Sequence, residues 1–107
     1  MATKKNWMDD FALVSTGKHV VQLKRYEANS EKNFLNLEFR DAEDVTIEVR
    51  LYSGYIPTFM AAINAQTKGG AGQTLKEMLK FAQTNSIDIW TYYDDYGLKA
   101  SYFPPKA

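Results

Sequence analysis

The stretch FLNLEFRDAEDVTIEVRLY, residues 34–52, decides the fold that the sequence predicts. Residues 34–40 and 45–52 both alternate strictly between apolar and polar side chains, a pattern typical of a β-strand with one buried face. The short acidic turn at 41–44 indicates that the two strands are antiparallel neighbours. The side chains expected on the buried face are Leu35, Leu37, Phe39, Val45, Ile47, Val49 and Leu51.

On the N-terminal side of this pair, Lys18–Tyr26 reads as a further strand. Its Val21 and Leu23 share one face, although Val20 blurs the alternation. The polar loop Ala28–Asn33 then leads into the second strand. Three consecutive strands joined by short loops predict an antiparallel meander.

On the C-terminal side the period changes from two to 3.6 residues. Pro57 suits the first turn of a helix, and the glycine cluster at 69–72 must end that helix. A second helix is expected from Thr74, which forms a capping box with Glu77. Its apolar stripe is Leu75, Met78, Leu79 and Ala82.

The β pattern returns in the last quarter of the sequence. Ser86–Tyr93 is expected to be the fourth strand, with Ile87, Ile89 and Thr91 on one face. Asp94–Gly97 is a hairpin turn. Leu98–Phe103 is the last strand, and Pro104 stops it because proline cannot donate to a sheet ladder.

The order βββ–α(α)–ββ predicts a single α+β domain that is mainly β. The preferred architecture is a five-stranded antiparallel OB-like barrel with the helical insertion between strands 3 and 4. An open sheet with the helices on one face satisfies the same pattern. Within residues 1–107, residues 1–16 are expected to form an N-terminal arm and residues 17–105 the OB-like body.

Composition narrows the class of protein. The chain has no cysteine, which excludes disulfides and Cys-ligated metal sites. Thirteen basic and thirteen acidic residues balance, which argues against a strongly electrostatic binder of the histone type. We expect a cytoplasmic protein, because no apolar run approaches the ~20 residues of a membrane span and no signal-peptide pattern is present.

Enzymatic chemistry finds little support in the sequence. His19 is the only histidine, no serine lies in a nucleophile-elbow context, and the carboxylate clusters lie in turns or the arm. The glycine cluster at 69–72 lacks the Lys-Ser/Thr pair of a phosphate-binding loop and reads as a flexible interhelical linker. We therefore expect no catalytic residues, no metal and no cofactor.

Aromatic and basic side chains alternate with the buried positions on several strands. Stacking faces for bases and cations for phosphates are what a single-stranded nucleic-acid surface requires. Lys24 and Tyr26 join this face if the first strand buries Val21 and Leu23. Glu38 and Glu48 share the face and would repel phosphate. The candidate nucleic-acid-binding residues are Lys24, Tyr26, Phe34, Arg40, Arg50, Tyr52, Trp90, Tyr92 and Lys99.

The same aromatic residues have structural interpretations. A helix or the arm can bury Phe34 or Trp90, and a dimer interface can cover Tyr52 and Tyr92.

Several segments together resemble the small single-stranded DNA-binding proteins of phages and prophages. They are residues 17–21, 33–39, 45–52 and 75–82, and an ending that runs from Trp90 through Gly97-Leu98-Lys99 to Pro105. The resemblance covers residues 10–105 and rests on order and turn placement. It implies an OB-fold that coats single strands during phage DNA replication and recombination. Many cellular members carry an acidic tail that recruits partners. This chain ends Phe103-Pro104-Pro105-Lys106-Ala107, so tail-mediated recruitment is not carried over.

The sequence thus predicts a non-enzymatic binding protein for single-stranded DNA that works as a homo-oligomer. The alternative is a small protein–protein interaction or inhibitor domain that uses the same aromatic face. Zero net charge and the acidic turns favour the alternative, whereas the strand order and the interleaving of aromatic and basic residues favour DNA binding.

Overall fold

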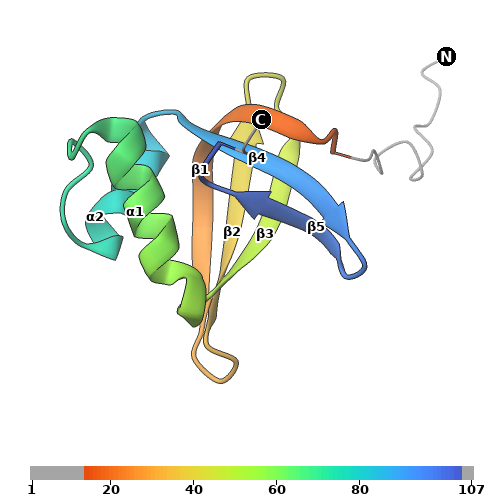
Figure 1. The fold of residues 1–107 in the computed structure, drawn as a ribbon, viewed down its shortest axis with the longest axis horizontal. Helices are drawn as coiled ribbons and strands as arrows, with labels where there is room; N and C mark the ends of the chain where they lie inside the picture. Colours follow the sequence, from red (N-terminus) through yellow and green to blue (C-terminus); the bar gives the residue numbers. More distant parts are fainter. Residues whose placement is uncertain (1–13, 105–107) are drawn as a thin grey trace, which may run out of the picture.

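The computed structural model describes residues 14–104, and most of the predicted N-terminal arm lies outside this range. Five strands and two helices follow the predicted order, with a single 3-10 turn, η2, between β3 and α1 (Figure 1). The elements are β1 (Gly17–Asn29), β2 (Phe34–Asp41), β3 (Thr46–Tyr52), η2 (Ser53–Tyr55), α1 (Ile56–Thr67), α2 (Leu75–Thr84), β4 (Ile87–Asp94) and β5 (Gly97–Ser101).

All five strands belong to one antiparallel sheet with the order β3-β2-β1-β4-β5. The long strand β1 is shared between two ladders: residues 17–21 pair with β4 and residues 21–29 pair with β2. The register with β2 shifts between Leu23 and Arg25, which leaves Lys24 as the extra residue of a β-bulge. Such a bulge bends its strand and increases the local twist.

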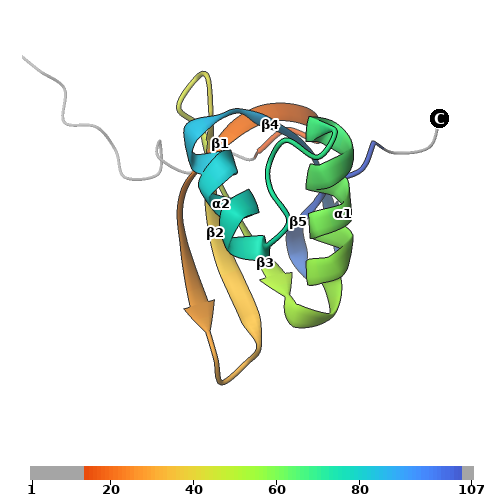
Figure 2. The same ribbon diagram turned by 90° about the vertical axis from the view of Figure 1, so that its left-hand side faces the viewer.

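The sheet is strongly curved, and its two edge strands approach each other. Cα atoms of β3 and β5 come within 8 Å, but no ladder joins the two strands within residues 14–104. The architecture is therefore an open five-stranded antiparallel sheet with two helices, which confirms the α+β, mainly β class. Figures 1 and 2 show α1 and α2 together on one side of this sheet.

One hydrophobic core fills the space between the inner face of the sheet and the helices. Every apolar residue that the alternation placed inward in 34–52 is buried except Val45, which precedes β3 and is exposed. Val21 and Leu23 of β1 and the stripe residues Met78, Leu79 and Ala82 of α2 join them. Tyr102 closes the core at the end of the chain, with its ring edge-on to Phe59 at 4.7 Å between centroids.

Gln66 connects α1 by hydrogen bonds to two segments that follow it in the sequence. Its amide group accepts from the Asp88 backbone N–H at 2.8 Å and donates to the carbonyls of Asp88 and Tyr102 at 2.7 and 3.1 Å. Because all three partners are backbone groups, one side chain fixes where β4 begins and where the chain runs after β5.

The predicted capping box at the start of α2 is confirmed. The Glu77 backbone N–H donates to Thr74 Oγ1 at 3.1 Å, and the Thr74 N–H donates to Glu77 Oε1 at 3.2 Å. Hydrogen bonds from the Gln73 backbone and from the side chain and backbone of Thr74 lower the pKa of Glu77. Gly72, with φ +105°, lets Glu77 fold back, because a Cβ there would lie 2.7 Å from the Glu77 Cβ. The glycine cluster is thus the interhelical connection, and its Ala71 is buried in the core.

Truncation of Ile47, which is fully buried, should create a cavity in this core. We expect Ile47→Ala to lower the free energy of unfolding by about 2–5 kcal/mol, as large-to-small core substitutions do. Chemical denaturation measures the loss. Val20→Ala, at an exposed position of β1, serves as the control and should cost less than about 1 kcal/mol. A loss below about 1 kcal/mol at Ile47 would show that the register of β3 is wrong.

Removal of the capping hydroxyl should weaken the second helix. We expect Thr74→Ala to destabilise the domain by about 0.5–2 kcal/mol, because the Glu77 backbone N–H loses its acceptor. Thermal and chemical denaturation of the variant measure this. Thr58→Ala, at an exposed position within α1, is the matched control. Equal stability of wild type and Thr74→Ala would contradict the capping role.

Burial raises the pKa of the Tyr102 phenol, and the Tyr92 phenol acts in the same direction. The folded state therefore holds this proton more tightly than the unfolded chain, whose tyrosines titrate near pH ~10. The resulting stabilisation is fully present below that pH and is lost as the pH rises above it. Denaturation between about pH 8 and 11 should show a shallower loss of stability for Tyr102→Phe than for wild type. Tyr55→Phe, an exposed control, should follow wild type.

Candidate nucleic-acid interface

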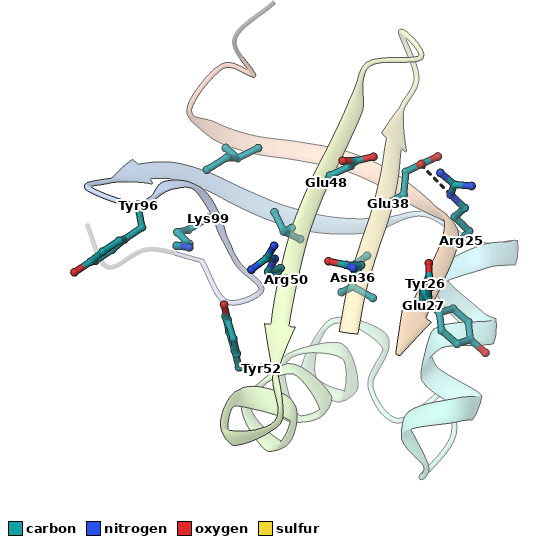
Figure 3. Close-up of a pocket in the computed structure, with 13 residues that line it drawn as sticks. Arg25, Tyr26, Glu27, Asn36, Glu38, Glu48, Arg50, Tyr52, Tyr96 and Lys99 are labelled. Atoms are coloured by element: carbon teal, nitrogen blue, oxygen red, sulfur yellow. Dashed lines mark hydrogen bonds and ion pairs between the residues drawn. The ribbon is translucent and has the colours of Figure 1, made fainter. Parts of the chain in front are cut away.

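The structure contains an open groove of about 1070 Å³. It crosses the outer face of β2 and β3 and runs from the C-terminal half of β1 to the β4–β5 hairpin (Figure 3). The labelled side chains in Figure 3 are those of Arg25, Tyr26, Glu27, Asn36, Glu38, Glu48, Arg50, Tyr52, Tyr96 and Lys99. Leu37, Val49 and Leu98 complete the lining.

Strand register arranges the outer-face residues into rows across three strands. One row is Glu27, Asn36 and Arg50, and the next is Arg25, Glu38 and Glu48. A third row, at the end of the groove, pairs Phe34 with Tyr52. Because side chains on one face of a strand recur every second residue, β3 presents Glu48, Arg50 and Tyr52 in sequence along the groove.

Two of these residues pack around a buried ring. Phe34 is only 6% exposed; the Tyr52 ring meets it edge-on at 5.4 Å between centroids. The Arg50 guanidinium carbon lies 4.7 Å from the centroid of the Phe34 ring, a cation–π distance. Phe34 thus supports Arg50 and Tyr52 from below. Because these two neighbours on β3 cover the ring, Phe34 offers little free surface on which a base could stack.

The cations in and beside the groove differ in whether they form ion pairs with carboxylates. Arg25 Nε lies 3.1 Å from Glu38 Oε1, and Arg40, beside the groove, contacts Glu38 at 3.8 Å and Asp44 at 3.2 Å. For Arg50 and Lys99, no ion pair occurs within residues 14–104. The charge available to an incoming anion is therefore at the β3–β5 side of the groove.

Carboxylates also line the groove. Glu38 and Glu48 are direct cross-strand partners, and like charges in that position are destabilising. Arg25 and Arg40 offset the charge of Glu38, whereas Glu48 has no cation partner among the described residues. The groove contains three cations and three carboxylates, so its overall charge is balanced.

The predicted residues divide between the groove and other surfaces. Arg50, Tyr52 and Lys99 lie together in it, as predicted. Trp90 and Tyr92 lie on the outer face of β4 and do not line the groove. Trp90 is half-buried opposite Lys18 and Ser101, while Tyr92 is exposed opposite Lys99 at the margin of the groove.

Of Lys24 and Tyr26, which the sequence predicts on the outer face, Tyr26 does line the groove, but from the register position of an inner-face residue. The bulge at Lys24 shifts the phase of β1, so that Arg25 and Glu27 oppose the outer-face residues Glu38 and Asn36. Tyr26 opposes Leu37, an inner-face residue, and Figure 3 shows its ring directed away from Arg50, Tyr52 and Lys99. Lys24 is exposed but does not line the groove.

Sequence reasoning missed Tyr96, which is 89% exposed at the tip of the β4–β5 hairpin. The sequence predicts only that this residue lies in a hairpin turn, with no role in binding. The signal was a large aromatic residue in the turn Asp94–Gly97, where polar residues and glycine are usual. Arg25 was also missed, because its place on the outer face depends on the bulge.

Residues 14–104 also bear on three other possibilities: a metal site, an unpartnered histidine and a membrane-spanning helix. They contain no group of three His, Asp or Glu side chains arranged to hold a metal ion. His19 is largely buried; its Nε2 donates to the Ser15 carbonyl at 2.7 Å, and Nδ1 lies 3.8 Å from an Asp41 carboxylate oxygen. His19 is thus a residue of β1 whose ring is hydrogen-bonded to the backbone. None of the helices in the described range is long and apolar enough to cross a membrane.

Comparison with protein-family models and with curated proteins found no match. The function proposed below therefore rests on the residues and geometry of the groove.

Proposed function

We propose that the chain is a non-enzymatic single-stranded DNA-binding protein of the phage type, with a partly open OB-like barrel as its body. The strand order, the helices between β3 and β4, and the bulged β1 shared by two ladders support this architecture. The close approach of β3 and β5 is what a barrel with incomplete closure requires.

The observation that carries the proposal is the position of the groove. In OB-folds, oligonucleotides bind on the face of strands 2 and 3 and at the loops that join strands 1–2 and 4–5. The groove occupies the outer face of β2 and β3 and extends to Tyr96 in the β4–β5 loop. The face that an OB-fold with this strand order uses for oligonucleotides is thus the face that carries the groove.

The side chains at the β3–β5 end suit a flexible single strand. Tyr52 and Tyr96 offer aromatic faces on which unpaired bases can stack, each worth about 1–3 kcal/mol. Lys99 lies on the side of Tyr96, and Arg50 is the neighbour of Tyr52 along β3 (Figure 3), so both cations can contact phosphates. Paired bases cannot present their faces to these rings, so duplex DNA gains only the phosphate contacts.

A protein-binding function is the second candidate, and the balanced charge of the groove favours it. A charge-neutral groove does not attract a polyanion from a distance. Its carboxylates and cations suit a protein partner with both signs of charge. For the DNA-binding function we propose a homo-oligomer in the cytoplasm of a bacterial host cell.

Binding of oligo-dT, duplex DNA and RNA of equal length, measured by fluorescence anisotropy at two salt concentrations, tests the proposal. We expect oligo-dT to bind more tightly than duplex. Tyr52→Ala should lose about 1–3 kcal/mol of binding free energy. Arg50→Ala should weaken binding and flatten its log–log salt dependence by about 0.7, the value for one phosphate contact on a single strand.

Two control variants locate the surface. Lys76→Ala removes an exposed cation on α2, outside the groove, and should leave the affinity and salt slope unchanged. Trp90→Ala separates the groove from the outer face of β4: a loss as large as that of Tyr52→Ala would move the binding surface to β4. All variants must show wild-type circular dichroism. Absence of oligo-dT binding at low salt would eliminate the DNA function and leave the protein-binding candidate.

A further inference from the structure

The groove presents three different chemical groups in a row along one strand. Tyr52, Arg50 and Glu48 occupy successive outward positions of β3, each about 7 Å from the next. The first offers a ring for stacking, the second a cation and the third a carboxylate. Figure 3 shows Glu48 on the same outer face as Arg50.

Glu48 remains available to a ligand. No cation of residues 14–104 pairs with it, whereas its cross-strand partner Glu38 is engaged by Arg25 at 3.1 Å and by Arg40 at 3.8 Å. Glu48 is exposed in the groove, on the part of β3 that lies opposite Glu38, and it pairs with neither arginine. It is therefore a carboxylate that is open to a hydrogen-bond donor.

This charge determines which part of a nucleotide can lie against Glu48. A phosphate beside it would meet a like charge, so the backbone is held at Arg50 and Lys99 instead. The group that can approach a carboxylate favourably is an N–H donor on the edge of a base. Unstacked bases in single strands are free to present their Watson–Crick edges in this way.

The four bases differ in how many donors that edge carries. Thymine has one ring N–H, and cytosine and adenine each have one amino group. Guanine has an N–H and an adjacent amino group, which match the two oxygens of a carboxylate. A pair of charge-assisted hydrogen bonds of this kind is stronger and more directional than a single neutral one.

We propose that Glu48 is a specificity-determining residue that reads the Watson–Crick edge of guanine in a single strand bound in the groove. This inference rests on the proposed DNA-binding function and adds a base preference to it. Tyr52 and Arg50 hold the neighbouring base and phosphate, so the preference applies to one position in the bound segment and leaves the rest non-specific.

The test uses three fluorescent oligonucleotides of about 12 nucleotides, a length within the range that an OB-fold covers. One is all thymine, one has a single central guanine, and one has hypoxanthine there, which lacks only the amino group of guanine. We expect wild type to bind the guanine oligonucleotide about 5-fold or more tightly than the all-thymine one, since a bidentate base contact contributes at least that much. The hypoxanthine oligonucleotide should fall between them.

Glu48→Gln should separate the two effects of the carboxylate. It should bind all three oligonucleotides with equal affinity, and the all-thymine one more tightly than wild type does, because a negative charge near the phosphates is removed. Glu43→Gln, in the exposed turn between β2 and β3, removes an equal charge outside the groove and should keep the guanine preference.

The outcomes distinguish this inference from the function on which it rests. Equal wild-type affinities for the three oligonucleotides, or a guanine preference that survives Glu48→Gln, would overturn the role of Glu48 while DNA binding stands. No binding to any of the three would overturn both.

Discussion

The rest of the structure depends on how β1 divides its backbone hydrogen bonds between two partners. Its first half pairs with β4 and its second half with β2, and Val21 is the one residue opposite both neighbours. A straight strand between two full-length partners would give a flat sheet with a single inner face. The bulge at Lys24 bends β1 shortly after this exchange of partners at Val21, and the curved sheet brings β3 and β5 close to each other.

The same bulge determines which side chains reach the groove. A slip of one residue moves every following side chain of a strand to the opposite face. After Lys24, Arg25 and Glu27 therefore lie beside the outward residues of β2, and Tyr26 lies on the side of Leu37. The Arg25–Glu38 ion pair, which reduces the negative charge of the groove, is a direct result of this shift. Backbone geometry in one strand thus sets the electrostatics of the neighbouring two.

Sequence patterns predicted most of this fold because most of its determinants are local. The alternation in 34–40 and 45–52 reports burial directly, and the Thr74–Glu77 capping box involves residues three apart. The bulge could not be predicted in this way. Lys24 has no glycine or other local signal, and its extra position is fixed only by the partners of β1. Whether the ends of the sheet close is likewise set by long-range pairing.

The candidate site was predicted only in part for related reasons. Alternation placed Arg50, Tyr52 and Lys99 on outward faces, and all three line the groove. It placed Trp90 and Tyr92 outward equally well, but alternation gives only two faces per strand. In a strongly curved sheet the outward faces of β3 and β4 point in different directions, so being outward does not put two residues on one surface. Phe34 shows that an outward-facing residue can also be buried, because Arg50 and Tyr52 cover its ring.

Charge balance over the whole chain says little about binding, because ion pairs redistribute the charge that a ligand meets. Glu38 forms ion pairs with Arg25 and Arg40, and Asp44 forms a further ion pair with Arg40. Among the described residues, what remains in the groove is a cationic end at Arg50 and Lys99 and the unpaired carboxylates of Glu27 and Glu48. A polyanion can use the first only if something other than a phosphate occupies the second. If the groove binds a single strand as we propose, this requirement orients it, with phosphates toward β5 and a base edge toward Glu48, and the carboxylate that would repel phosphate becomes a source of base selectivity.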